Sequence, residues 1–174
     1  MPHRIQLVFP VSFNREIARQ IAQLVAKVIE PAEVTADFFT PTFPAKAYFP
    51  QRNQYDSSIL LKALSTIPRV ADRTIFILNV DLFSQGLNFV FGQAEWPGRC
   101  AVVSTYRLKD DANPPALMTR LGKEVVHELG HTLGLPHCNS PACVMFFSNS
   151  LKETDFKSDH FCVACNSKID LKRI

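Results

Sequence analysis

The sequence predicts an α/β (α+β) fold with a small subdomain at its C-terminal end. Strand-like and helix-like segments alternate over the first two-thirds of the chain, as in a layered arrangement of helices on a sheet. The length of 174 residues, with 47% hydrophobic and 20% charged residues, suits one domain with a substantial core. Four of the five cysteines lie in the last third. We therefore expect a single domain, with a main body over residues 1–137 and a cysteine-rich subdomain over residues 138–174.

The first elements follow from turn residues and hydrophobic spacing. Residues 4–11 (RIQLVFPV) are rich in β-branched and aromatic residues, which favours a strand. Asn14 can cap a following helix, and Pro31 ends that helix. Residues 32–39 are a second strand candidate, and three prolines within 40–54 indicate a loop. The helix has an apolar face whose members recur at helical spacing: Ile17, Ile21, Leu24, Val25 and Val28.

The middle of the chain supplies one helix and three strand candidates. Residues 55–66 (YDSSILLKALST) suit a helix. Residues 73–80 (RTIFILNV) are almost continuously apolar, which indicates a central strand covered on both faces. Residues 87–96 have a strand-like composition in which Gly92 marks a bulge or a turn, and residues 99–108 form a further strand.

A long helix is expected over residues 115–133, after Pro114 and Pro115. Gly134 and Pro136 stop it, because a glycine favours the helix end and a later proline prevents continuation. One stripe of the helix is apolar: Leu117, Leu121, Val125, Leu129 and Leu133.

The charge pattern argues against nucleic acid as a partner. The net charge is +3 with a pI near 8.6, and the sequence has no dense run of lysines or arginines. The start of the chain lacks the pattern of a signal peptide, and no apolar stretch is long enough to cross a bilayer. We therefore expect a cytoplasmic monomer that needs no membrane. The basic residues of the tail are spread among acidic ones: Lys152, Lys157, Lys168, Lys172 and Arg173.

Residues 127–138 read HELGHTLGLPHC, and the first part of this stretch indicates a metal site. His127 and His131 are four residues apart, so on a helix both imidazoles lie on one face and can reach one cation. Glu128 lies beside them and can take a proton from a water molecule at the metal without being a ligand. Gly134 allows a sharp turn, after which His137 can join as a third ligand. The pattern HExxHxxGxxH is therefore typical of a catalytic zinc site.

Cys138 could complete that site or belong to another. As a fourth ligand it would close the site to water and would leave Cys143 without its pair. Adjacent side chains of an extended segment point to opposite sides, so we expect Cys138 to face away from the zinc that His137 binds. With Cys143, Cys162 and Cys165 it would then form a closed four-cysteine site, which is structural. The sequence thus predicts two zinc ions, one catalytic and one structural.

The same stretch resembles a known family. HELGHTLGLPH, followed by CVM at 143–145, resembles the metzincin metallopeptidases, which carry an elongated zinc motif and then a methionine in a turn. The added cysteines of CNSPAC and CVAC are similar to those of the archaemetzincins in particular. The resemblance is densest over residues 122–165 and extends upstream through GLNFVFGQAEWPGRCAVVSTYRL.

The resemblance implies a zincin-like fold with a mixed, twisted sheet whose last strand borders the active-site cleft. It implies that the three histidines bind the catalytic zinc, that Glu128 acts as general base and then as general acid, and that Met145 packs beneath the histidines in the Met-turn. The expected function is zinc-dependent hydrolysis of peptides or proteins. The alternative is a non-catalytic, zinc-stabilised binding module, which would have no use for Glu128.

A few other residues carry weaker expectations. The strand at 99–106 could be an open edge that pairs with an extended peptide. Cys100 is expected in the core, and His160 and Glu124 at the surface. The two phenylalanines that directly follow Met145 are expected either to line the substrate pocket or to pack in the core: Phe146 and Phe147.

Overall fold

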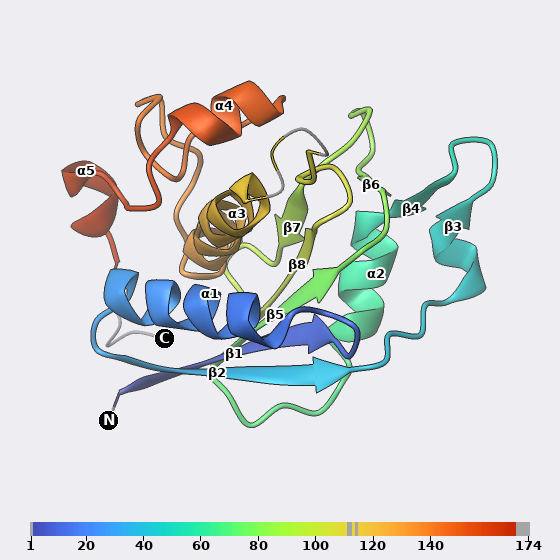
Figure 1. Ribbon diagram of the computed structural model, residues 1–174, viewed down its shortest axis with the longest axis horizontal. Helices are drawn as coiled ribbons and strands as arrows, with labels where there is room; N and C mark the ends of the chain where they lie inside the picture. Colours follow the sequence, from blue (N-terminus) through green and yellow to red (C-terminus); the bar gives the residue numbers. More distant parts are fainter. Residues whose placement is uncertain (1, 111–112, 114, 170–174) are drawn as a thin grey trace.

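A mixed five-stranded sheet lies at the centre of the protein (Figure 1). The computed structural model describes residues 2–110, 113 and 115–169; Pro114, Lys172 and Arg173 of the sequence analysis lie outside this part. The strand order is β2-β1-β5-β8-β7, in which β7 alone runs antiparallel to its neighbour. Its strands are β1 (His3–Pro10), β2 (Ala32–Phe39), β5 (Arg73–Leu78), β7 (Gly92–Ala94) and β8 (Cys100–Ser104).

Helices cover both faces of this sheet. Helices α1 and α3 pack on one face and against each other, and α2 packs on the other face (Figure 1). The described helices are α1 (Arg15–Val28), α2 (Ser57–Leu64), α3 (Ala116–Thr132), α4 (Leu151–Phe156) and α5 (Val163–Asn166). The described remainder includes a 3₁₀ turn, η1 (Ala45–Ala47), and a small second sheet of β3 (Tyr48–Phe49), β4 (Gln54–Asp56) and β6 (Leu82–Phe83).

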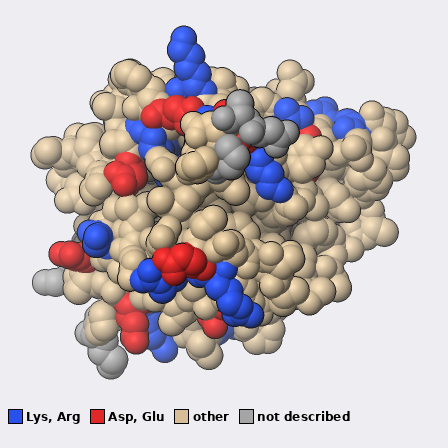
Figure 2. All heavy atoms as spheres, in the orientation of Figure 1, with Lys and Arg blue, Asp and Glu red and all other residues tan. Residues whose placement is uncertain are grey.

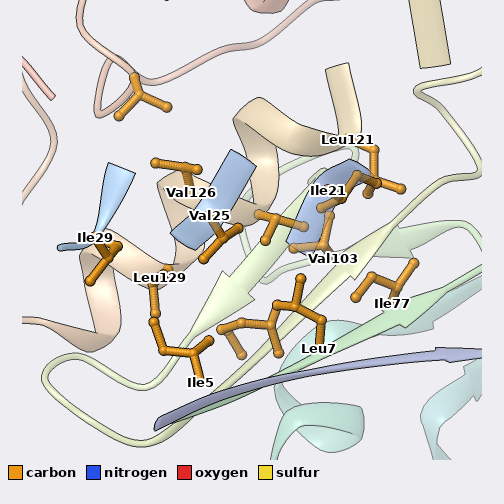
Figure 3. Packing of buried hydrophobic residues seen from close by; sticks show 14 of the residues in the cluster. Ile5, Leu7, Ile21, Val25, Ile29, Ile77, Val103, Leu121, Val126 and Leu129 are labelled. Carbon is orange, nitrogen blue, oxygen red and sulfur yellow. The ribbon is translucent and has the colours of Figure 1, made fainter. Parts of the chain in front are cut away.

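The larger core lies between α1, α3 and the sheet (Figure 3). Ile5 and Leu7 of β1 meet Ile21 and Val25 of α1, and Leu129 of α3 closes the same layer. All six residues of β5 are buried, so the prediction of a central strand is confirmed. Residues of the tail join this core too, because it contains Cys143, Val144, Met145 and Cys165.

Local sequence signals set the helix starts. The Asn14 side chain accepts hydrogen bonds from the backbone N–H groups of Glu16 and Ile17, at 2.9 and 3.0 Å, as predicted for a cap. The next helix begins later than the predicted 55–66, because Asp56 is its cap and Tyr55 belongs to β4. The predicted loop at 40–54 also contains the short elements η1 and β3.

The expectation of an open edge at 99–106 is wrong. Strand β8 lies inside the sheet, with β5 on one side and β7 on the other. The edge strand on this side of the sheet is β7, which covers only three residues of the predicted strand at 87–96. The hydrophobic pattern could not reveal this, because strand order depends on pairing between segments that are distant in sequence.

Charged side chains of both signs are interspersed on the face drawn in Figure 2. A group of charged residues on α3 and α4 joins the tail to the main body. Arg120 on α3 binds the Asp155 carboxylate of α4 through two hydrogen bonds of 2.6 Å, and Lys123 donates to the carbonyls of Thr154 and Asp155. None of the described helices is long and apolar enough to span a membrane.

Candidate metal centres

Three histidines converge at the C-terminal end of α3. His127 and His131 lie one turn apart on that helix, and the chain then turns at Gly134, whose φ of 88° is in the region that favours glycine. The turn brings His137 back to the other two, so that one ring nitrogen of each lies within 4.8 Å of the others. The predicted three-histidine cluster is thus present as a geometric arrangement.

Hydrogen bonds fix the orientation of two of these rings. The Nδ1 of His127 lies 2.7 Å from the Val144 carbonyl oxygen, and the Nδ1 of His131 lies 2.8 Å from that of Leu135. A carbonyl oxygen only accepts, so each Nδ1 carries the proton and each Nε2 presents a lone pair. The two Nε2 atoms face each other at 3.1 Å. Two lone pairs at this distance repel unless a cation lies between them, and tetrahedral zinc would place its nitrogen ligands about 3.3 Å apart.

The electrostatics of the rings suit a metal site. Burial is the largest cause that lowers the pKa of all three imidazoles, well below the ordinary range for His127 and to about 4 for His131. The positive charge of Lys157 acts in the same direction. The rings are therefore neutral near pH 7, which is the state that binds metal.

The side chain of Glu128 extends from α3 toward the edge strand β7 and lies next to the histidine cluster. It is only 5% exposed, and burial together with the nearby Glu124 raises its pKa well above the ordinary value. Gly92 of β7 faces it closely: a Cβ atom at position 92 would lie 2.6 Å from the Glu128 Oε1. The glycine that the sequence marked as a bulge or turn is therefore a point of close approach, and no side chain fits there without displacing the carboxylate.

A cleft of about 460 Å³ opens at the histidines and Glu128. Strand β7 forms one wall, and Phe147 packs against His137 on another, with ring centroids 4.9 Å apart. Phe147 thus lines the pocket, whereas Phe146 is not among its lining residues. The remaining wall is largely apolar and includes Leu87, Phe89, Phe91 and Trp96.

The four cysteines of the tail form a second cluster. Their sulfur atoms lie within 4.8 Å of one another, and the Sγ atoms of Cys138 and Cys162 are 3.9 Å apart, close to the roughly 3.8 Å expected between thiolates on tetrahedral zinc. Backbone N–H donation from Cys165 lowers the pKa of Cys162 to about 7, which favours the thiolate. His137 and Cys138, although adjacent, belong to different clusters.

Met145 lies directly behind the histidine helix. It is fully buried, and a Cβ atom at Gly130 would come within 2.4 Å of its sulfur and 2.9 Å of the Phe161 ring. The glycine of HELGH therefore lets the methionine pack against the helix between the two histidines. Cys100 is buried, as expected, and His160 is exposed, as expected.

The expectation of a surface position for Glu124 is wrong. Glu124 is 3% exposed, and its Oε1 lies 3.0 Å from the Lys157 Nζ and 3.2 Å from the Thr154 hydroxyl, which donates to it. The Lys157 side chain is fully buried and also donates to the Phe146 carbonyl. Nothing in the sequence singles out Lys157, because its partner is 33 positions away and the pair forms only when α4 docks.

A helix that carries HExxH beside the edge strand of a mixed sheet, with a third histidine returning from a glycine turn, defines the class of zinc metallopeptidases. Comparison with known proteins gives the same class. Residues 45–171 match Peptidase family M54, and the chain belongs to this family.

The relatives are archaemetzincins, as the resemblance predicted. The chain is 48% identical over 132 residues to the archaemetzincin of Methanopyrus kandleri, covering 75% of each protein. It is 37% identical to that of Thermococcus kodakarensis over 95% of each. The crystal structure of the Methanopyrus kandleri protein superposes with a TM-score of 0.85 at 38% identity, covering 97% of this chain and 93% of the other. The crystal structure of Archaeoglobus fulgidus archaemetzincin complexed with malonate superposes with a TM-score of 0.79 at 34% sequence identity. The match covers 95% of this chain and 99% of the other. The zincin-like fold is thereby confirmed.

Proposed function

We propose that this metallopeptidase hydrolyses peptide bonds in the cleft beside β7, with Glu128 as general base and with His127, His131 and His137 as ligands of the catalytic zinc. The observation that carries the proposal is the convergence of three neutral imidazole nitrogens on one point beside a buried carboxylate. When bound there, zinc polarises a peptide carbonyl and lowers the pKa of a water molecule.

The protein's own groups account for the proton transfers. Glu128 takes the proton from the attacking water molecule and later donates it to the nitrogen of the departing amine. Burial raises the pKa of Glu128, so its carboxylate is a stronger base than that of an exposed glutamate, which favours taking the proton. Gly92 keeps the space in which the carboxylate lies, and the carbonyls of Val144 and Leu135 hold the rings of His127 and His131 in position.

The substrate is an extended peptide that pairs with the exposed edge of β7. Gly92, Gln93 and Ala94 line the cleft, and an edge strand offers free backbone groups to a partner strand. The apolar wall around Phe89 and Phe147 favours a hydrophobic side chain next to the scissile bond.

The second zinc ion of the proposal is bound by Cys138, Cys143, Cys162 and Cys165 and has a structural role. Four cysteines gathered at metal-ligand spacing favour a reducing compartment such as the cytoplasm, where they stay available to bind zinc.

In the same proposal, Met145 forms the Met-turn beneath the histidines. Residues 1–137 and 138–174 unfold as one domain, since the described tail residues share the main core. The protein acts as a monomer, which sedimentation would test.

The test combines metal analysis with a single substitution. We expect two zinc ions per chain in the wild type and in Glu128→Gln, and a loss of peptide turnover of about 10²–10⁴-fold in the variant. Glu33→Gln is the matched control, because Glu33 is exposed on β2 at the opposite edge of the sheet. Equal turnover in wild type and Glu128→Gln would refute the catalytic role and favour a binding module.

A further inference from the structure

A stretch of three buried residues, Cys143–Val144–Met145, connects the two metal-binding clusters. The Cys143 sulfur belongs to the cysteine cluster. The carbonyl of Val144, the next residue, accepts the hydrogen bond from the His127 Nδ1 at 2.7 Å. The Met145 carbonyl accepts from the backbone N–H of Cys138 at 2.9 Å. Cys143, a member of the cysteine cluster, is therefore adjacent in the chain to Val144, whose carbonyl orients His127 of the histidine cluster.

The connection has little freedom to adjust. Cys143, Val144 and Met145 are at most 1% exposed, and the Val144 N–H donates to the His160 carbonyl at 3.0 Å. A planar peptide bond leaves two soft torsions per residue, so the direction of the Val144 carbonyl depends on where the Cys143 backbone is held. Close packing transmits such a displacement rather than absorbing it.

The two helix histidines differ in this respect. His131 is oriented by the Leu135 carbonyl, and Leu135 is itself bonded to Gly130 of the same helix. That arrangement is local to the end of α3. His127, by contrast, is oriented from the tail, 17 residues further along the chain.

We propose that the cysteine cluster sets the metal affinity of the histidine cluster, through the Val144 carbonyl that orients His127. Metal at the four thiolates fixes Cys143, which holds the carbonyl in place and keeps the His127 Nε2 turned toward its partners. By thermodynamic linkage, metal at the histidines tightens the cysteine cluster by the same factor. The inference rests on the proposed ligands of the two sites and not on peptide hydrolysis, so it can fail or hold independently of the Glu128 test.

The experiment uses the cobalt-substituted full-length chain, in which thiolate charge-transfer absorption reports the cysteine cluster separately. Zinc affinity of the histidine cluster is measured by competition with a chelator in wild type, in Cys165→Ser and in the control Cys100→Ala. Cys165 is a cluster member that does not adjoin Val144, and Cys100 lies in β8 outside both clusters. We expect Cys165→Ser to weaken the histidine site by about 10–100-fold, the range typical of losing an orienting partner, and Cys100→Ala to leave it unchanged.

A second readout separates orientation from general loosening of the fold. NMR of the zinc-bound protein should show that the Nδ1–H proton of His127 loses its hydrogen-bonded chemical shift in Cys165→Ser, while that of His131 keeps it. Unchanged affinity in Cys165→Ser, or equal changes at the two rings, would overturn the proposal.

If Cys165→Ser does not fold, stepwise cobalt titration of the wild type decides the question. Coupling requires the histidine site to tighten once the thiolate band has saturated, whereas independent filling of the two sites refutes it.

Discussion

Replacing Gly92 by alanine should disable the enzyme without removing its metal. The new Cβ atom would lie 2.6 Å from the Glu128 Oε1, 2.7 Å from its Cγ and 2.7 Å from the Val102 carbonyl oxygen. Ordinary contacts of this kind are near 3.5 Å, so the carboxylate must move by about 1 Å. A displacement of this size at a reacting group costs about 10²-fold in rate.

The Val102 oxygen belongs to the neighbouring strand, which is buried and cannot move freely. We therefore also expect a loss of about 1–3 kcal/mol in the free energy of unfolding, as for other overpacked sites. The assay is kcat on a peptide mixture followed by mass spectrometry, together with zinc content and the urea midpoint. Full zinc content with a kcat near 1% of wild type is the expected result.

Gly122→Ala provides the matched control. Gly122 lies on the same helix as Glu128, and its added Cβ would meet only the Cδ2 of Leu24, the far end of a flexible side chain. Replacing glycine in a helix stabilises it by about 1 kcal/mol, which offsets this contact, so activity should be preserved. Wild-type kcat in Gly92→Ala, with folded protein and bound zinc, would show that Gly92 does not position Glu128.

Two further experiments test the packing beneath the site. Lys157→Met leaves the Glu124 carboxylate buried without its cation and should cost about 3–5 kcal/mol in urea unfolding, whereas Lys157→Met combined with Glu124→Gln should recover most of that loss. A double variant no more stable than Lys157→Met would contradict the pairing. Gly130→Ala places a methyl group against the Met145 sulfur and the Phe161 ring, and should lower the melting temperature by the equivalent of about 1–3 kcal/mol. An unchanged melting temperature would mean that this contact is loose.

Predictions of caps and tight turns, which depend on neighbours in the sequence, agree with the structure. Asn14 caps its helix as expected, and Gly134 adopts the positive φ that lets His137 return to His127 and His131. These features involve groups separated by a few residues, for which helix and turn geometry fixes the distances in advance. The separation of His137 from Cys138 was predictable for the same reason, since an extended backbone directs successive side chains apart.

Two predictions that depend on distant segments are wrong. The sequence predicts an open edge at 99–106, although β7 pairs with β8 there. The sequence predicts a surface position for Glu124, although docking of the tail brings Lys157 to it. Both errors arise from contacts between segments that are far apart in the sequence, and a short stretch of sequence does not reveal such contacts.

The sequence by itself determined which atoms are candidate metal ligands: the histidines of HELGHTLGLPH and each pair of cysteines follow from ligand spacing on a helix, in a turn or in a short loop, which is a local property. Only the tertiary structure decided what surrounds those atoms. The Val144 carbonyl at His127, Gly92 at Glu128 and the buried ion pair behind them all arise from docking the tail and the edge strand against α3. The physical reason is that the burial and directed hydrogen bonds that tune a site come from segments brought together by the common core, and their contacts exist only once that core has formed.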